Sequence, residues 1–360
     1  MGEADGTRPH KGRGAASKPA GRFQTVTHEP VDDGWRETDT QAPPLRTEVA
    51  VDASRSAITW NDSPDLPFDR SINPYRGCEH GCVYCYARPS HAYWDLSPGL
   101  DFESRLLMRP EVPRLLEKEL ADPDYRCAPM ALGTNTDPYQ PIEKKYGVTR
   151  QVLEVLSRAE HPVTITTKSA LVERDLDVLA PMAERGQAAV VVSLTTFSRE
   201  LSRNLEPRAA APSRRLQVIR SLRQAGIPVG VLVAPVVPVL TDSEIEMILE
   251  AVAKAGAGSA GYVLLRLPHE VEGLFREWLT NSYPLKADHV MSQLREVRGG
   301  QTSDSRFGRR LTGTGSYAEM IGRRFNLACK RLRLGGHAHA LDTSRFTPPP
   351  PPTGTQLKLF

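Results

Sequence analysis

Apolar and polar positions change in regular blocks along most of the chain. From Ser71 onward, short apolar runs alternate with stretches whose apolar residues recur at helical spacing. The apolar runs, which we expect to be strands, are 130–134, 163–167, 188–196, 229–237 and 261–267. The helices expected between them are 150–159, 171–185, 213–225 and 242–255. Continuous apolar strands that alternate with helices are typical of a parallel sheet in an α/β domain.

One more strand is expected just before Cys78, which gives six β/α units. A further strand is predicted within 49–60 and would lead into the domain. We assign residues 55–285 to this α/β domain. In barrels built from such units, the chemistry lies at the carboxyl ends of the strands.

Residues 1–50 contain few apolar side chains and are rich in Gly, Pro, Arg and Asp. This composition predicts a mostly disordered segment, either a solvated tail or a basic binding arm. The chain has 46 Lys and Arg against 43 Asp and Glu, and a net charge of +3 does not by itself indicate nucleic-acid binding. No apolar run reaches the ~20 residues of a membrane helix, and the first residues lack the apolar core of a signal peptide. We therefore expect a cytoplasmic protein with reduced thiols.

Residues 286–345 form a basic extension with helices predicted at 288–298 and 317–334. Between 295 and 334, ten Lys and Arg stand against three acids. The residues that dominate this excess are Arg306, Arg309, Arg310, Arg323, Arg324, Lys330, Arg331 and Arg333. The pattern fits a surface that neutralises phosphates, or equally a solvated helix face.

Three of the five cysteines fall within eight residues, as Cys78, Cys82 and Cys85. Soft thiolates at this C-x3-C-x2-C spacing select iron–sulfur clusters, zinc or copper(I). A cubane cluster needs four ligands, so three close thiols leave one iron open to a small molecule. The alternatives are a zinc site completed by His80 or His91 and a disulfide. Zinc sites more usually use paired C-x2-C units, and so tight a cluster in a reduced compartment disfavours a disulfide.

This spacing, with Tyr84 just before the last cysteine, resembles the signature of the radical SAM superfamily. In that family the open iron binds the amino and carboxylate groups of S-adenosylmethionine (SAM), and reductive cleavage yields a 5′-deoxyadenosyl radical. The resemblance implies a partial (β/α)6 barrel of the TIM type and a [4Fe-4S] cluster held by the three cysteines. It also implies SAM as cofactor and an electron donor such as flavodoxin or ferredoxin.

The strand ends supply candidate residues for binding SAM. The family often has Gly-Gly-Glu after the second strand to bind the methionine amino group; this chain differs there, so Thr134, Asn135 or Asp137 would serve. The alternative is a polar turn, because Asn and Asp favour turns.

Later strand ends add further candidates. Lys168 can hold a carboxylate as a point charge. Ser193 and Thr195 point to one face of their strand and would suit ribose hydroxyls. Glu206 and Arg208 contact the cofactor or each other. Arg266 is a candidate ligand for a substrate or a carboxylate.

Four segments are similar to the branch of spore photoproduct lyase-related proteins called DNA repair photolyases. They are 72–78, 133–141, 168–169 and 206–208. In the true lyase, a cysteine near the end of the second strand returns a hydrogen atom to the lesion. Here Ala131, Leu132 and Gly133 offer no thiol, and Cys127 lies at the beginning of that strand. The candidate hydrogen donors by nearness in sequence are Tyr75, Tyr86 and Tyr139.

Residues 346–360 form a Pro-rich spacer followed by a short apolar peptide. The peptide resembles the motif that bacterial proteins insert into the sliding clamp, through Gln356, Leu357, Leu359 and Phe360. The alternative is a tail that packs back onto the domain.

The sequence therefore predicts a radical SAM enzyme that acts on nucleic acid with lyase-like, DNA repair-like chemistry. The rivals are a radical SAM enzyme for a peptide or small molecule and a zinc-bearing interaction module without turnover.

Overall fold

The computed structural model describes residues 11–23, 45–335 and 340–350, and its centre is a seven-stranded sheet. The strand order is β10-β9-β8-β7-β6-β3-β2, and only the β2–β3 pair is antiparallel. The strands are β2 (Ile58–Trp60), β3 (Arg70–Ile72), β6 (Met130–Leu132), β7 (Val163–Thr167), β8 (Ala188–Ser193), β9 (Val229–Val236) and β10 (Ser259–Leu264). The six parallel strands confirm the predicted partial barrel.

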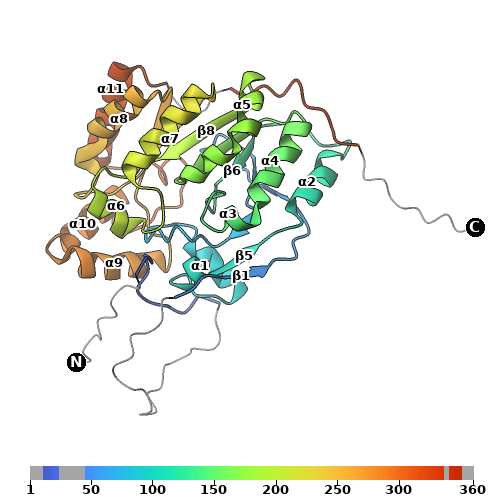
Figure 1. The fold of residues 1–360 in the computed structure, drawn as a ribbon. Helices are drawn as coiled ribbons and strands as arrows, with labels where there is room; N and C mark the ends of the chain where they lie inside the picture. Colours follow the sequence, from blue (N-terminus) through green and yellow to red (C-terminus); the bar gives the residue numbers. More distant parts are fainter. Residues whose placement is uncertain (1–10, 24–44, 336–339, 351–360) are drawn as a thin grey trace, which may run out of the picture.

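Helices cover the outer side of this sheet (Figure 1). They are α2 (Val112–Leu120), α4 (Val148–Arg158), α5 (Leu176–Glu184), α7 (Pro212–Gln224) and α8 (Ile245–Ala255). Short 3-10 turns precede two of them, η2 (Ala170–Asp175) before α5 and η3 (Asp242–Glu244) before α8. Val163, Ile165, Val190 and Ile248 are fully buried, so the apolar strands and the apolar helix faces form one core.

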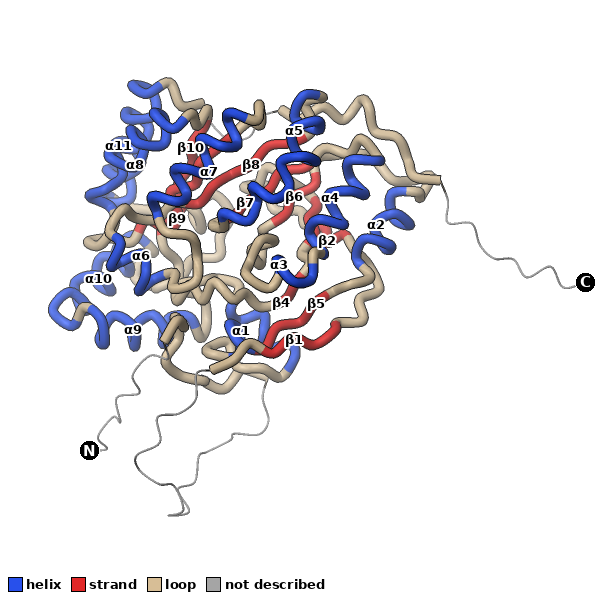
Figure 2. Tube along the Cα trace, viewed as in Figure 1, coloured by secondary structure: helices blue, strands red, loops and turns tan. Residues whose placement is uncertain are grey.

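A second, small sheet pairs β1 (Glu48–Val51) with β5 (Arg105–Met108) and β5 with β4 (Tyr75–Arg76). The prediction of one strand within 49–60 is wrong, because β1 and β2 belong to different sheets. Polar contacts stabilise the segment between β1 and β2. Asp52 accepts a hydrogen bond from Arg76 at 2.6 Å, and Arg109 donates to the Ser56 carbonyl at 2.5 Å. Figure 2 shows this sheet beside the main one.

Residues 11–23 lie against the domain, which differs from the disorder expected for the first fifty residues. Glu103 of α1 (Asp101–Ser104) accepts backbone bonds from Gly14 at 2.9 Å and Ala15 at 2.8 Å. The Arg13 side chain donates to the Glu103 carbonyl at 2.6 Å. A buried carboxylate is costly unless it accepts hydrogen bonds. The bonds to Glu103 therefore hold this segment in place, although it has few apolar side chains.

Two helices form most of the C-terminal extension, α10 (Pro284–Val297) and α11 (Ser316–Leu332), and α9 (Val271–Ser282) precedes them. Five of the eight basic side chains named for this region form ion pairs, namely Arg306–Asp304, Arg310–Asp65, Arg323–Glu319, Arg324–Glu246 and Arg331–Glu250. This pairing favours the solvated-face interpretation over a phosphate-binding patch on α11.

Two remaining predictions concern membranes and the tail. Within the described residues, none of the helices has the length and hydrophobicity to cross a bilayer. The clamp-like peptide at 356–360 lies outside the described residues.

Candidate functional site

The cysteine loop lies between β4 and the 3-10 helix η1 (Arg88–Trp94). Cys78 and Cys82 are buried, Cys85 is half-buried, and all three are free thiols. Bonds from Gly81 N to the Cys78 carbonyl (3.3 Å) and from Cys85 N to the Cys82 carbonyl (3.2 Å) keep the loop tight. Gly81 has a φ of 67°, a conformation that other L-residues rarely adopt.

The thiols are suitable ligands for an iron–sulfur cluster. Burial raises the pKa of Cys82 to about 12 and raises that of Cys78 as well. Soft sulfur ligands of this kind bind such clusters as thiolates.

A buried ion pair contacts the backbone of the cysteine loop. Arg88 and Glu103 are fully buried, and Arg88 Nη2 lies 2.5 Å from Glu103 Oε1. The Arg88 guanidinium also donates to the carbonyls of Cys82 (2.9 Å) and Gly81 (3.2 Å). Sequence reasoning missed this pair, although an arginine three residues after the last cysteine was a visible signal.

Asp137 connects the loop to the end of β7. Its carboxylate accepts from Thr167 Oγ1 and from Lys168 N, both at 2.7 Å, and lies 3.3 Å from His80 Nδ1. Burial would raise the pKa of Asp137, but His80 and these donors outweigh it and hold the pKa at about 2. Of the three candidates after β6, Asp137 therefore already has hydrogen-bond partners within the protein.

Thr134 and Asn135 lie closer to solvent than Asp137. Thr134 Oγ1 and the Asn135 backbone both contact Asn73, at 3.4 Å and 3.1 Å. Thr134 is half-buried and Asn135 is exposed. Asn135 is thus the most exposed of the three candidates.

Tyr84, Thr195, Glu206 and Arg215 form one buried network. Tyr84 and Arg215 each donate to the Glu206 carboxylate, and Thr195 Oγ1 donates to it at 2.8 Å. Burial would raise the pKa of Glu206, but Arg215, Lys168 and Tyr84 lower it to about 2. The structure therefore places Glu206 against Arg215, a partner that sequence reasoning missed, and not against Arg208.

Lys168 and Ser193 contact each other across neighbouring strands. Lys168 Nζ donates to Ser193 Oγ at 2.9 Å and lies 6.0 Å from the Tyr84 ring centroid. Its charge acts on Cys82 and Glu206. Lys168 is only half-buried, whereas Ser193 and Thr195 are almost fully buried. The lysine can therefore reach a ligand, while the two hydroxyls have protein partners.

Arg208 lies at the outer side of the loop. Its guanidinium pairs with Glu79, and its backbone N donates to the His80 carbonyl at 3.2 Å. These contacts tie the segment after α6 (Arg199–Leu205) to the cysteine loop. Arg208 therefore stabilises the cysteine loop through its contacts with Glu79 and His80.

The three candidate tyrosines have different surroundings. Tyr75 and Tyr139 are fully buried, and their hydroxyls donate to Glu143 of α3 (Glu143–Tyr146) and to Asp175 (3.0 Å). Tyr86 is 45% exposed, and its hydroxyl donates to the Thr134 carbonyl. Only Tyr86 among them is open to a substrate.

Cys127 precedes β6 and interacts with Arg70. It thus lies at the amino end of that strand, as predicted, while the cysteine loop lies at the carboxyl ends.

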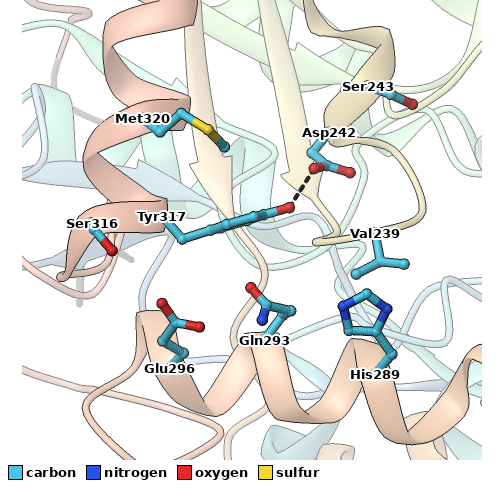
Figure 3. A pocket seen from close by; sticks show the side chains of 9 residues that line it. All are labelled: Val239, Asp242, Ser243, His289, Gln293, Glu296, Ser316, Tyr317 and Met320. Atoms are coloured by element: carbon cyan, nitrogen blue, oxygen red, sulfur yellow. Dashed lines mark hydrogen bonds between the residues drawn. The ribbon is translucent and has the colours of Figure 1, made fainter.

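A pocket lies away from the cysteines. It has a volume of about 720 Å³ and lies between the loop after β9, α10 and α11. Figure 3 shows its lining side chains, with Tyr317 donating to Asp242 and with His289, Gln293 and Glu296 following one face of α10. None of the predicted site residues lines it.

Comparisons with known proteins agree with this geometry. The family model for the radical SAM superfamily matches residues 72–252. An uncharacterized protein of Mycobacterium tuberculosis is 37% identical over 275 residues, covering 75% of this chain and 76% of that protein. An uncharacterized protein of Acidianus two-tailed virus is 31% identical over 199 residues, covering 52% and 64%.

Solved structures share the fold at low sequence identity. Spore photoproduct lyase complexed with dinucleoside spore photoproduct aligns with a TM-score of 0.56 and 15% identity, covering 80% of both chains. A mutant of the same lyase aligns with a TM-score of 0.57 and 14% identity. The family-model match spans half of the chain and includes all three cysteines of the loop, so the protein belongs to the radical SAM superfamily, whose cofactors are a [4Fe-4S] cluster and SAM.

Proposed function

We propose that this enzyme cleaves SAM reductively and uses the resulting radical on a nucleic-acid substrate. Cys78, Cys82 and Cys85 would hold the cluster, Lys168 would bind the SAM carboxylate, and Thr134 and Asn135 would bind the SAM amino group. When bound, the two cofactors would supply the radical chemistry needed to remove a hydrogen atom from the substrate.

The observation that carries the substrate class is the fold. The chain aligns over 80% of its length with a lyase solved in complex with a dinucleoside lesion. The thiol that the true lyase uses is absent after β6, and Cys127 lies at the opposite end of the strand. We therefore propose nucleic acid as the substrate class, with Tyr86 in place of a cysteine as the hydrogen donor.

The remaining residues position this machinery. The Glu206 network fixes Tyr84 beside Lys168, and the Arg88–Glu103 pair fixes the loop carbonyls. Arg88, Glu103, Glu206 and Arg215 are all at most 2% exposed, so these charged groups are held away from solvent. A flavodoxin or ferredoxin would deliver the electron. Binding of the sliding clamp by Gln356, Leu357, Leu359 and Phe360 stays a prediction.

Anaerobic reconstitution followed by incubation with SAM and a reductant tests the proposal. We expect about four irons per chain, release of 5′-deoxyadenosine, and an altered product from ultraviolet-irradiated single-stranded DNA. Tyr86→Phe should keep SAM cleavage and lose the DNA product. Cleavage of SAM without any change in DNA or RNA would favour a peptide or small-molecule substrate. Zinc in place of iron would favour the interaction module.

A further inference from the structure

Two arginines and two exposed aromatic rings meet at the carboxyl end of β10. The Arg266 guanidinium lies 4.8 Å from the Tyr86 ring centroid, and the Arg310 guanidinium lies 4.9 Å from the Phe307 ring centroid. Tyr86 is 45% exposed and Phe307 is 54% exposed. The bond from Leu264 N to the Leu311 carbonyl (2.8 Å) brings the end of β10 and the Arg310 segment together, and burial and the charge of Arg310 both lower the pKa of Arg266.

Among the residues that the structure describes, the Arg266 guanidinium contacts the Tyr86 ring and has no carboxylate of its own. No hydrogen bond or ion pair joins its guanidinium to another residue in the described ranges 11–23, 45–335 and 340–350. The nearby carboxylate of Asp65 is already held by Arg310 at 2.6 Å. A third arginine, Arg298, is buried and donates to backbone carbonyls, including that of Leu265 at 3.0 Å. A half-buried cation without a partner is costly unless a ligand supplies the anion.

Arg266 and Lys168 have different surroundings. Arg266 lies over the Tyr86 ring, whereas Lys168 Nζ donates to Ser193 Oγ at 2.9 Å and lies 6.0 Å from the Tyr84 ring centroid. Their strands, β10 and β7, are separated in the sheet by β9 and β8. One cation can therefore bind the SAM carboxylate while the other stays free for a second anion.

The site also joins distant segments of the chain. β2 and β10 stand at the two ends of the strand order, and Asp65 belongs to the loop between β2 and β3. The Arg310–Asp65 pair and the bond from Gly308 N to Asp65 (3.3 Å) join this loop to the segment after α10. That segment also contacts the end of β10, where Leu264 N donates to the Leu311 carbonyl at 2.8 Å. Arg266, two residues after Leu264, thus lies beside this junction.

We propose that Arg266 binds a phosphodiester group of an unpaired nucleic-acid strand and that the exposed Phe307 ring stacks on an adjacent base. The inference rests on the proposed function and adds to it how the strand is held. Arginine forms charge-assisted bonds to phosphate, and alternating cations and aromatic rings are the chemistry that binds unpaired nucleotides.

A double comparison of protein and ligand tests the inference on the reconstituted full chain. The probes are a short labelled oligothymidylate with phosphodiester linkages and the same sequence with neutral methylphosphonate linkages, measured by fluorescence anisotropy. Arg266→Gln should weaken phosphodiester binding about tenfold and leave methylphosphonate binding unchanged. Arg323→Gln is the matched control, because Arg323 is 79% exposed on α11. The iron content and the dissociation constant for SAM are measured for each variant.

Each alternative result would contradict a specific part of the proposal. If Arg266→Gln binds the phosphodiester probe like wild type, the inference fails and the proposed function stands. If the variant loses affinity for SAM and not for the probe, Arg266 serves the cofactor and the inference fails. If wild-type protein binds neither probe, the nucleic-acid function fails and the inference with it.

A second pair of measurements keeps the inference testable if Arg266→Gln does not fold. Wild-type protein should bind the charged probe about tenfold more tightly than the neutral one, and equal affinities would overturn the role of Arg266. Phe307→Ala should weaken binding of both probes, whereas Tyr93→Ala, whose exposed ring packs on Phe23, should not. Unchanged binding by Phe307→Ala would overturn the stacking role.

Discussion

Gly14 packs directly on the carbonyl oxygen of Gly81 in the cysteine loop, although the two residues are far apart in sequence. A Cβ atom on Gly14 would lie 1.8 Å from that oxygen. On the other side of the loop, the Arg88 guanidinium donates to the same oxygen at 3.2 Å. The N-terminal segment 11–23 is therefore part of the support of the cysteine loop.

Replacing Gly14 should disturb the loop without touching a cysteine. In Gly14→Ala, the new methyl group must displace residues 13–15 from Glu103, which leaves a buried carboxylate with fewer donors. We expect a lower free energy of unfolding, by about 1–3 kcal/mol, and faster loss of iron in air. Urea denaturation and iron release measured over time check this.

Gly273→Ala is the control for that variant. Gly273 lies within α9 and has no atom within 4 Å of an added Cβ, so alanine should leave stability unchanged or raise it by up to about 1 kcal/mol. Equal iron release from Gly14→Ala and wild type would show that the segment does not support the loop.

Cys82→Ala should abolish cluster binding. Removing one of the three thiols leaves too few ligands, so we expect iron to fall to background and SAM cleavage to cease. Cys329→Ala is the matched control, because Cys329 is a buried thiol on α11 remote from the loop in the fold. Iron analysis and 5′-deoxyadenosine release distinguish them. A Cys82→Ala protein that still cleaved SAM would falsify the assignment of the ligands.

Glu206→Gln should strongly destabilise the protein. Arg215 and Glu206 are each 1% exposed, and the substitution leaves a buried guanidinium without its counter-charge. The expected loss in the free energy of unfolding is about 3–5 kcal/mol. Urea denaturation of the metal-free protein measures it. Glu319→Gln breaks an exposed pair with Arg323 and should cost less than about 1 kcal/mol. Similar losses in the two variants would contradict a special role for the buried pair.

His161 should make stability depend on pH between about 6.5 and 4. The ring is fully buried and accepts a bond from the Tyr125 hydroxyl (2.7 Å), while Nδ1 donates to the Pro162 carbonyl (3.0 Å). Burial lowers the pKa of His161 to about 4. The unfolded chain therefore binds the proton first as the pH falls. This contribution to stability is complete above pH 6.5 and is lost progressively towards pH 4, by roughly 3 kcal/mol.

Denaturation of the metal-free protein at several pH values tests this dependence. His161→Gln should reduce the slope between pH 6.5 and 4, and His91, which is buried and whose pKa is also lowered by burial, should supply the remainder. Asp137 and Glu206 titrate lower, because each has a pKa of about 2, and should add a separate loss of stability below pH 4 in both proteins. The same slope in wild type and His161→Gln would assign the effect to other groups.

The sequence alone determined the order of the elements and the place of the chemistry. Hydrophobic periodicity is a local property, so the strands at 163–167 and 229–236 and the helices after them could be predicted. The three thiols are close in sequence, and a short loop must keep them close in space. The carboxyl ends of parallel strands then had to bring Lys168 and the cysteines to one edge of the sheet.

The tertiary structure decided which charged groups meet. Glu206 could pair with Arg208 or Arg215, and packing buried it against Arg215, because a buried carboxylate is stable only beside a buried partner. Arg324 and Arg331 of α11 pair with Glu246 and Glu250 of α8, which no local pattern indicates. Glu103, Gly14 and Gly81 meet only in the folded chain, as do Arg266 and Tyr86. Such contacts depend on how distant segments pack, and local sequence patterns do not encode them.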